Sequence, residues 1–247
     1  MNLENTLIIG AMHHKTGTVL LNRVLRIIIP PYFKEVKGNV KGNGKGRPPT
    51  GTIDFSNNIN CEPHYIHFPH SKFGNFKDVC PNFKGIHIIR NPFEIITSAY
   101  NYHKVCNEPW VLGTYQQTVN TLSRDEGLMY EINEIGGNVI RNMVSFDYTD
   151  KRILTVSIED FYCNFDKTIS TIANFLGYDE HECIKSCRSL DKNRNRKLKD
   201  RSSHITNKSN DKYRYNKFLK KAHKQQVIKI VEKYQSCNFM DKFGYID

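Results

Sequence analysis

The sequence predicts a three-layer α/β/α domain built on a central parallel sheet. Two observations predict it: short apolar runs of the kind found in strands buried on both faces, and segments of helical periodicity that alternate with those runs along the chain. The length of 247 residues suits one such domain, and no internal repeat divides residues 1–247. Helices are therefore expected on both faces of the sheet.

The first predicted unit is a strand, a loop and a helix. Residues Thr6–Met12 form a short, mainly apolar run, which is typical of a buried parallel strand. The polar loop His13–Thr18 follows, and apolar residues then recur at helical spacing from Val19 until Pro30 stops the helix. The backbone N–H groups at the start of such a helix, with the positive end of its dipole, can hold an anion at the loop.

Further strands and helices alternate along the rest of the chain. The patterns predict strands at 64–68, 85–89 and 152–157, and helices at 92–105, at 113–146 with an interruption at Gly136-Gly137, at 165–176 before Gly177, and at about 217–236. Residues 37–51 are rich in Gly, Lys, Asn and Pro, which predicts a mobile surface loop. Residues 185–224 form a basic C-terminal segment, with fifteen Lys and Arg against three Asp.

The composition favours an anionic partner. There are 36 Lys and Arg against 25 Asp and Glu, a formal net charge of +11, and nucleic acid, an acidic membrane, a polyanionic sugar or a phosphorylated cofactor would each suit that excess. The seven cysteines have no Cys/His spacing that completes a zinc site, so we expect no metal and reduced thiols. Because the N-terminus lacks a signal-peptide pattern and no apolar run is long enough to span a membrane, we expect a soluble, cytoplasmic protein.

The first motif that carries chemistry is the loop after the first strand. Lys15 supplies a charge, Gly17 lets the backbone approach an anion closely, and Thr16 and Thr18 add hydroxyl donors. A standard P-loop would have a second glycine where this chain has His14. Taken alone, the motif is explained equally well by an ordinary turn that contains threonine and glycine.

The second motif is an arginine and a serine that flank the start of a helix. Arg90 follows a predicted strand, at the edge of the sheet where open α/β proteins bind ligands, and Ser98 lies two turns into the next helix. A guanidinium can bind two phosphate oxygens and a hydroxyl can donate to a third. Taken alone, an arginine at a strand end and a buried serine in a helix have a simpler, structural explanation.

Together and in this order, the two motifs resemble the donor-binding motifs of sulfotransferases that use 3′-phosphoadenosine 5′-phosphosulfate (PAPS). The resemblance implies a fold similar to that of P-loop nucleotide-binding proteins, PAPS as cofactor, adenosine 3′,5′-bisphosphate as product, and no metal. It implies that the 5′-phosphosulfate is held by Lys15, Thr16, Gly17 and Thr18, and the 3′-phosphate by Arg90 and Ser98. Lys15 is also expected to stabilise the charge that grows on the leaving phosphate oxygen.

The same resemblance implies a histidine base for in-line transfer to a hydroxyl or amine of a small molecule or carbohydrate. Ile66-His67-Phe68-Pro69 resembles the family's Thr-His-Leu-Pro, which implies His67 as the base. His64 and His70 lie close to it, and Glu62 is a further alternative because some members that modify glycans use a glutamate. His13 and His14 flank the lysine and are expected to line the loop.

The basic C-terminal segment stands where the family has a flexible loop that closes over the 3′-phosphate. Position and charge imply Arg201, Lys208 and Arg214 as further ligands of that phosphate, although the family's Arg-Lys-Gly sequence is absent. A solvated basic surface explains the same segment equally well.

Three other kinds of protein compete with the sulfotransferase. A P-loop kinase or nucleotide hydrolase needs an acidic magnesium ligand at the strand end where this chain has Arg90. A basic module that binds nucleic acid or another polyanion would use residues 185–224 but leaves both motifs unexplained. A relative that binds the cofactor without catalysis is the third. The PAPS-dependent enzyme accounts for both motifs, and we expect neither nucleic acid nor a membrane as its partner.

Overall fold

The computed structural model describes residues 7–30, 83–191 and 214–245 in full, and the backbone of residues 34–37 and 64–69. No helix in these described ranges is both long and apolar enough to cross a lipid bilayer.

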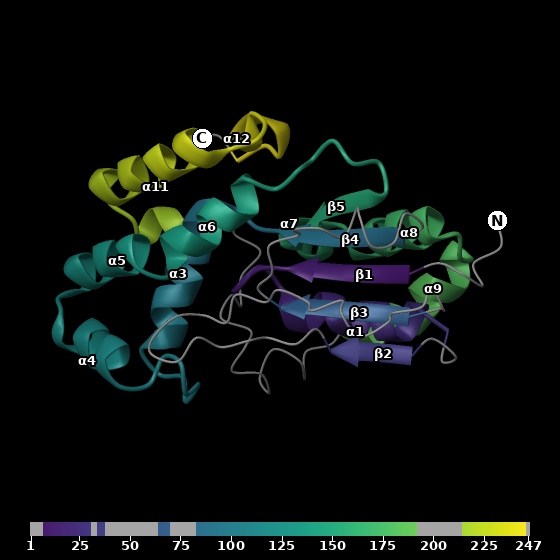
Figure 1. Ribbon diagram of the computed structural model, residues 1–247, viewed down its shortest axis with the longest axis horizontal. Coiled ribbons are helices and arrows are strands. Elements are labelled where there is room, and N and C mark those ends of the chain that lie inside the picture. The colour runs from purple at the N-terminus through teal and green to yellow at the C-terminus, as the bar shows by residue number, and fades with distance from the viewer. Residues whose placement is uncertain (1–6, 31–33, 38–63, 70–82, 192–213, 246–247) are drawn as a thin grey trace, which may run out of the picture.

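Five parallel strands form one sheet at the centre of the fold (Figure 1). Their order across the sheet is β2-β3-β1-β4-β5, with bounds β1 (Leu7–Met12), β2 (Lys34–Lys37), β3 (His64–Pro69), β4 (Phe83–Ile89) and β5 (Ile153–Ser157). Every pair of neighbours is parallel. β1 lies in the middle and all six of its residues are buried, as its apolar sequence predicts. The predicted α/β class and central parallel sheet are confirmed.

The sheet contains one strand that the sequence analysis did not predict. β2 is only four residues long, Lys34–Lys37, and its two lysines and one glutamate hide the apolar alternation of a strand. It pairs with β3 as an edge strand, where charged residues are common. Lys37, assigned to the predicted loop 37–51, ends this strand, and the rest of that loop lies outside the described residues.

Local sequence signals mark the start of α3 and the end of α8. Asn91 accepts a hydrogen bond from the backbone N–H of Phe93 at 2.9 Å and so caps α3, whose first residue is Pro92. α8 ends at Gly177, which takes a left-handed φ of +87°. The helices are α1 (Thr18–Ile28), α3 (Pro92–His103), α4 (Thr114–Thr121), α5 (Arg124–Asn133), α6 (Gly136–Val144), α7 (Ile158–Cys163), α8 (Phe165–Leu176), α9 (Glu180–Cys187), α11 (Lys221–Tyr234) and α12 (Phe239–Lys242), with 3₁₀ turns η2 (Arg188–Leu190) and η3 (Arg214–Lys217).

The predicted interruption at Gly136-Gly137 is in fact the start of α6. The middle segment breaks at Leu122 and again before Gly136. Both glycines are buried, and neighbouring atoms leave no room for a side chain at either position. A Cβ on Gly136 would lie 2.5 Å from Cδ1 of Ile96, and one on Gly137 would lie 2.0 Å from the carbonyl oxygen of Ile132. These glycines therefore permit close packing of α6 against α3 and α5.

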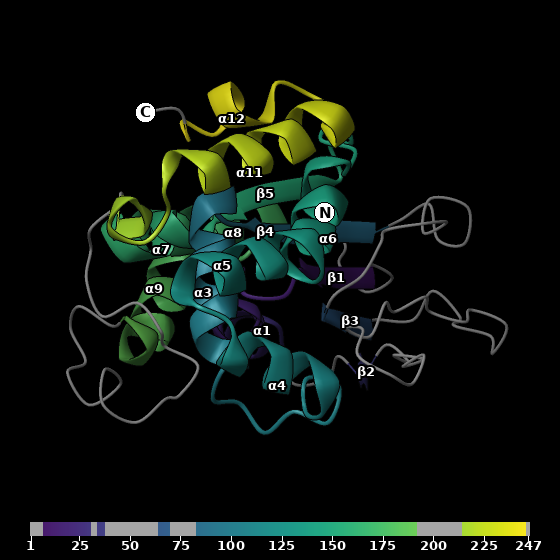
Figure 2. The ribbon, with the colours of Figure 1, turned by 90° about the vertical axis from the view of Figure 1, so that its left-hand side faces the viewer.

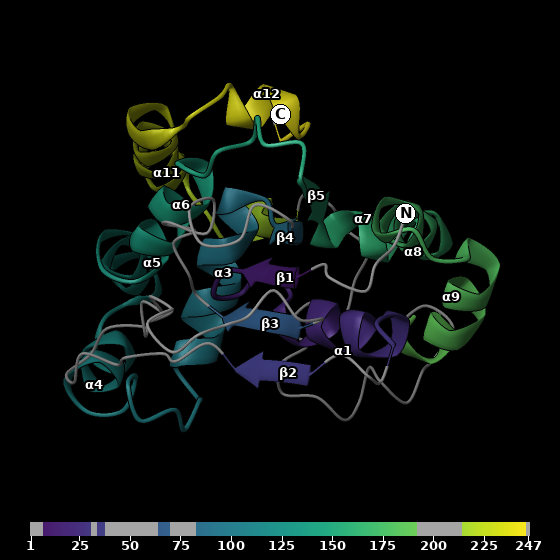
Figure 3. The same ribbon diagram turned by 45° about the vertical axis from the view of Figure 1, so that its right-hand side comes forward.

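α1, α8 and α9 pack together along the sheet (Figure 3). Ile86 and Ile88 of β4 join a buried cluster that includes Leu21 of α1 and Ile169 of α8. His87, between these isoleucines, points to the opposite face, where its ring centroid lies 4.1 Å from that of Phe146.

A second group of helices, α3 to α6 and α11, stands beyond the carboxyl ends of the strands (Figures 1 and 2). These helices share a separate core built from residues such as Ile96, Leu128, Ile140 and Val227. The loop after the central strand β1 opens toward this group. It lies where the strand order turns, which is the usual ligand site of open parallel sheets.

Candidate active site

The loop between β1 and α1, residues 13–17, is closed by hydrogen bonds to His13. The carbonyl oxygen of His13 accepts from the Thr16 hydroxyl at 2.8 Å, the Thr18 hydroxyl at 3.2 Å and the Thr16 N–H at 3.2 Å. The Thr16 oxygen in turn accepts from the His13 N–H at 3.0 Å. Both threonines therefore hold the loop in shape, and their predicted contacts to a phosphate stay a prediction.

Left-handed backbone conformations at two residues make this loop tight. Gly17 has φ +107° and Lys15 has φ +64°, a conformation that a residue with a side chain rarely adopts. A Cβ on Gly17 would lie 2.7 Å from Cδ1 of Ile158 and 3.0 Å from Cδ1 of Ile88. Only glycine therefore fits between the loop and these two isoleucines, and α1 begins at the next residue with its N–H groups toward the loop.

The Lys15 ammonium is removed from water and lies over an aromatic ring. Its Nζ lies 3.7 Å from the centroid of the Tyr102 ring. Burial, and secondly the nearby Arg90 guanidinium, lower the pKa of Lys15 to about 7, while Glu108, Cys106 and Glu131 act in the opposite direction. An anion bound at the loop would reverse this shift.

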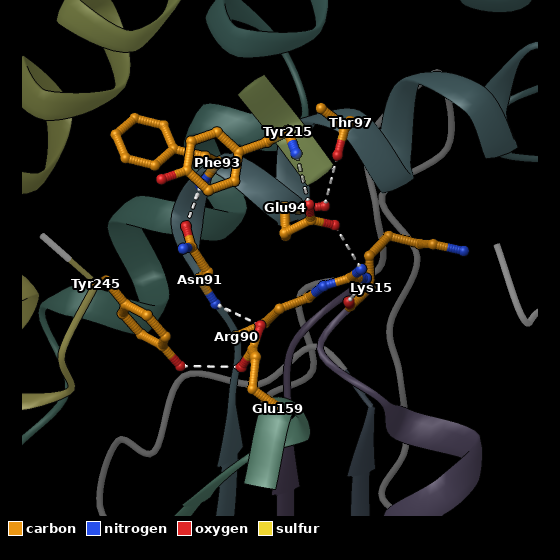
Figure 4. Close-up of polar contacts among 9 residues, drawn as sticks. All are labelled: Lys15, Arg90, Asn91, Phe93, Glu94, Thr97, Glu159, Tyr215 and Tyr245. Carbon is orange, nitrogen blue, oxygen red and sulfur yellow. Dashed lines mark hydrogen bonds and ion pairs between the residues drawn. The ribbon is translucent and has the colours of Figure 1, made fainter. Parts of the chain in front are cut away.

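Arg90 joins the second motif to the first (Figure 4). It follows β4, is 4% exposed, and its Nη1 donates to the carbonyl oxygen of Lys15 at 2.9 Å. Its Nη2 donates to Oε2 of Glu94 at 3.2 Å. Its Nε is buried and has no hydrogen-bond partner among the described residues. In Figure 4 the Lys15 side chain extends away from the guanidinium.

Two carboxylates, the buried Glu94 and the half-buried Glu159, support the turn that holds Arg90. Oε1 of Glu94 accepts from the backbone N–H of Tyr215 at 2.9 Å, which ties α3 to η3. Glu159, at the start of α7, accepts from the Asn91 N–H at 3.2 Å and from the Tyr245 hydroxyl at 3.1 Å. Burial raises the pKa of Glu159. Residues 68, 86 and 121 positions apart thus meet near the end of β4 (Figure 4).

The two histidines that precede Lys15 each pair with a histidine from another element. Nε2 of His13 lies 2.9 Å from Nε2 of His87, and Nε2 of His14 lies 2.9 Å from Nε2 of His103. Burial, and secondly His13, hold the pKa of His87 well below its usual value. The sequence analysis expected His13 and His14 to line the loop but did not identify their partners, because a histidine inside a strand or helix carries no local signal of such a contact.

The structure describes only some of the other predicted site residues. Ser98 is buried in α3, and Arg214 lies in η3 with its guanidinium carbon 5.3 Å from the centroid of the Phe218 ring. The backbone of His67 pairs with Gly10 of β1, and His64 begins β3. Glu62, His70, Arg201 and Lys208 lie outside the described residues. The described part of the chain contains no group of three or more histidine, cysteine or carboxylate side chains that could hold a metal.

The fold and this loop define an open parallel α/β protein with a tight, glycine-containing turn between its central strand and α1. The family model of the sulfotransferase domain matches residues 57–238. The chain therefore belongs to the sulfotransferase domain family. A search of curated proteins found no match.

Solved structures with the same fold include two other proteins. One is a mouse sulfotransferase, SULT7A1, complexed with PAP, with a TM-score of 0.59, 16% sequence identity and coverage of 98% of this chain and 87% of that chain. The other is retinol dehydratase in complex with androsterone and the inactive cofactor PAP, with a TM-score of 0.60, 12% identity and coverage of 95% and 82%. At these identities the likeness concerns the fold alone.

Proposed function

We propose that this protein transfers a sulfuryl group from PAPS to a hydroxyl or amine of a small molecule or carbohydrate. Membership of the sulfotransferase domain family supports the reaction, and the solved neighbours that contain PAP support the donor. The observation that carries the proposal is the contact between Arg90 and the Lys15 carbonyl, because it brings the two predicted donor motifs to one place.

The residues at this place fit a ligand with phosphate groups. A buried guanidinium N–H has no partner among the described residues, and burial and Arg90 lower the pKa of Lys15 to about 7, so a bound anion would stabilise both groups. A phosphate oxygen near Arg90 would accept from Nε, and a sulfate or phosphate at the loop would restore the charge of Lys15. The buried Glu94 balances part of the charge of Arg90, which leaves the remainder for a ligand.

In this proposal the side chains of the two motifs hold opposite ends of the donor. Lys15 and the N–H groups at the start of α1 hold the 5′ end of the donor, with Thr16, Gly17 and Thr18 shaping the loop around it. Arg90 and Ser98 hold the 3′-phosphate, together with the basic residues Arg201, Lys208 and Arg214. PAPS supplies an activated sulfuryl group when bound, and Lys15 stabilises the negative charge left on the phosphate side. A histidine takes the acceptor proton, and the family resemblance names His67.

The test is stabilisation of the protein by adenosine 3′,5′-bisphosphate against ATP, measured by thermal unfolding. A ligand at 100 times its Kd stabilises the folded state by about 2.7 kcal/mol. We expect that stabilisation for the bisphosphate without magnesium and much less for ATP with magnesium. Stabilisation by magnesium and ATP alone would instead point to a kinase or nucleotide hydrolase and overturn the proposal.

A further inference from the structure

The Lys15 ammonium lies against a tyrosine whose own hydroxyl is bound to a carboxylate. Nζ of Lys15 is 3.7 Å from the centroid of the Tyr102 ring. The Tyr102 hydroxyl donates to Oε1 of Glu108 at 2.6 Å. The phenol thus contacts the ammonium with its face and the carboxylate with its hydroxyl. We call Tyr102 and Glu108 the lysine clamp.

The fold fixes both members of the lysine clamp close to the loop. Tyr102 lies near the end of α3 and is 6% exposed, and its carbonyl oxygen accepts from the Cys106 N–H at 2.9 Å. Nε2 of Gln116, in α4, donates to the carbonyl oxygens of His103 at 2.9 Å and of Cys106 at 2.8 Å. The segment that carries Glu108 is therefore bonded to both α3 and α4 within a few residues of the tyrosine.

The proton between the two members of the lysine clamp belongs to Tyr102. Burial, and secondly the hydrogen bond to Glu108, raise the pKa of Tyr102, so the phenol stays protonated and is the donor. A carboxylate that accepts this proton's hydrogen bond draws positive charge away from the ring and makes its face more negative. The negative face of an aromatic ring attracts a cation. Glu108 therefore favours the charged form of Lys15 both through the ring and by its own charge.

The other groups that face Lys15 come from several elements. Burial, and secondly Arg90 after β4, lower the pKa of Lys15 to about 7. Three groups act in the opposite direction, of which Glu108 has the largest effect, and the other two are Cys106 and Glu131. The rings of His14 and His103 each lie 5.9 Å from the Tyr102 ring. Among these described groups, the lysine clamp is the main attraction that opposes burial and Arg90.

We propose that Tyr102 and Glu108 are positioning residues of sulfuryl transfer, which hold the charged ammonium of Lys15 at the donor loop. The inference rests on the proposed function, in which Lys15 stabilises the charge left on the phosphate side. A lysine has a long, flexible side chain and loses its charge readily when buried. The ring fixes the place of the ammonium, and the carboxylate keeps the proton on it. Both residues act through Lys15, so their loss changes the charge state of that lysine.

The first test reads the charge of Lys15 and needs neither donor nor acceptor. NMR of protein labelled with carbon-13 at lysine Cε, with the signal assigned by Lys15→Arg, gives the pKa of Lys15. We expect Glu108→Gln to lower this pKa by about half a unit or more, because it removes an opposite charge and keeps the volume of the side chain. Glu182→Gln is the matched control and should leave the pKa unchanged, since that carboxylate is 71% exposed on α9.

Two replacements of Tyr102 test the ring itself. Tyr102→Leu removes the aromatic face but keeps the site apolar, so it should also lower the pKa of Lys15. Tyr102→Phe keeps the face and loses the bond to Glu108, so its effect should be smaller. An unchanged pKa in both Glu108→Gln and Tyr102→Leu would overturn the proposal. A rise in Tyr102→Leu would do the same, because the ring would then only exclude water. Glu108→Gln decides alone if Tyr102→Leu does not fold.

The second test compares the affinity for adenosine 3′,5′-bisphosphate at pH 5.5 and at pH 8. At pH 5.5 Lys15 is charged in the free protein with or without Glu108, whereas at pH 8 binding must first add a proton. The affinity of Glu108→Gln relative to wild type should therefore fall about threefold between the two pH values for a shift of half a unit. The ligand's own titration cancels in this ratio. The same ratio at both pH values would mean a general structural effect and would overturn the role of the clamp.

Turnover separates this inference from the proposed function. Release of the bisphosphate from PAPS at pH 8, with water as the acceptor, should fall about tenfold in Tyr102→Leu and less in Tyr102→Phe. A wild-type protein that neither binds the bisphosphate nor turns over PAPS contradicts the proposed function, while the NMR result still decides whether Tyr102 and Glu108 hold the charge of Lys15. An active enzyme whose Lys15 pKa ignores both residues overturns the lysine clamp alone.

Discussion

The guanidinium of Arg90 donates a hydrogen bond to the backbone carbonyl of Lys15 across 2.9 Å, although 75 positions separate the two residues. The contact goes to the backbone, so Arg90 positions the loop whatever the Lys15 side chain does. Glu94 holds the same guanidinium from the other side. Arg90 therefore has a structural task that can be separated experimentally from its proposed task in binding.

Replacement of Arg90 by methionine should destabilise the protein by about 3 kcal/mol or more, because it leaves the buried Glu94 carboxylate without its charged partner. Urea unfolding measures this change. The double variant R90M/E94Q should recover much of the loss, since a neutral amide at position 94 can still accept from the Tyr215 N–H. Binding of adenosine 3′,5′-bisphosphate should stay weak in both variants. Recovery of binding with recovery of stability would show that Arg90 acts on the fold alone.

Replacement of Lys15 by methionine should separate stability from turnover. The folded protein holds this ammonium with a pKa of about 7, whereas the unfolded chain has the ordinary value of 10.5, so below pH 7 the buried charge lowers the free energy of unfolding. We expect Lys15→Met to raise that free energy at pH 6 by about 1 kcal/mol, after the loss of its contact with Tyr102.

Turnover of PAPS by the same variant should fall at least about 10²-fold, as for the loss of one electrostatic stabiliser. Lys15→Arg is the matched control, because it keeps a charge that cannot be lost by deprotonation and should therefore gain no stability. Near-normal turnover in Lys15→Met would show that Lys15 does not contribute to the reaction.

Replacement of Gly17 by alanine tests the tight loop. The new Cβ meets Ile158 at 2.7 Å and must adopt φ +107°, so we expect a loss of about 2–3 kcal/mol in the free energy of unfolding. Gly113→Ala is a matched control, since Gly113 also has positive φ, +95°, but has nothing within 4 Å of its added Cβ. That control should lose only about 1 kcal/mol. If chemical denaturation shows equal losses in the free energy of unfolding for the two variants, then the contact with Ile158 is not the reason that position 17 requires glycine.

The sequence predicted the sheet well because buried parallel strands leave a strong local pattern. β1, β4 and β5 were predicted to within about two residues of their bounds, and α8 was predicted with its bounds intact because Gly177 ends it. β2 was missed because it has only four residues, three of them charged, and so shows no apolar pattern. The interruption predicted at Gly136-Gly137 lies directly before these glycines, at residues 134–135; the glycines themselves begin α6, where neighbouring helices leave no room for a Cβ, and no local pattern reveals that contact.

The candidate site was predictable only where a motif spans consecutive residues. Lys15 and Arg90 were found from such motifs, and the structure brings Arg90 to the Lys15 loop. Glu94 carries a weak signal, because it lies four positions after Arg90 on one helix face. Tyr215 and Tyr245 carry none, since they come from the C-terminal elements and meet the site only through the tertiary fold.

Binding of adenosine 3′,5′-bisphosphate should depend on pH in a direction set by Lys15. In the free protein the pKa of Lys15 is about 7, and a bound anion raises it, so binding above pH 7 takes up a proton. Affinity should therefore be nearly constant just below pH 7 and fall above it, by at most about tenfold per pH unit.

Isothermal titration calorimetry in Tris and in HEPES at pH 8 measures the proton uptake, because the two buffers differ in their heat of ionisation. We expect up to about one proton per bound ligand in the wild type and a much smaller uptake in Lys15→Met. The comparison between proteins cancels protons exchanged by the ligand itself. Affinity that is constant between pH 7 and 9, with equal proton uptake by both proteins, would show that the Lys15 ammonium does not contact the bound phosphate. The N–H groups of α1 would then have to bind the 5′ end of the donor.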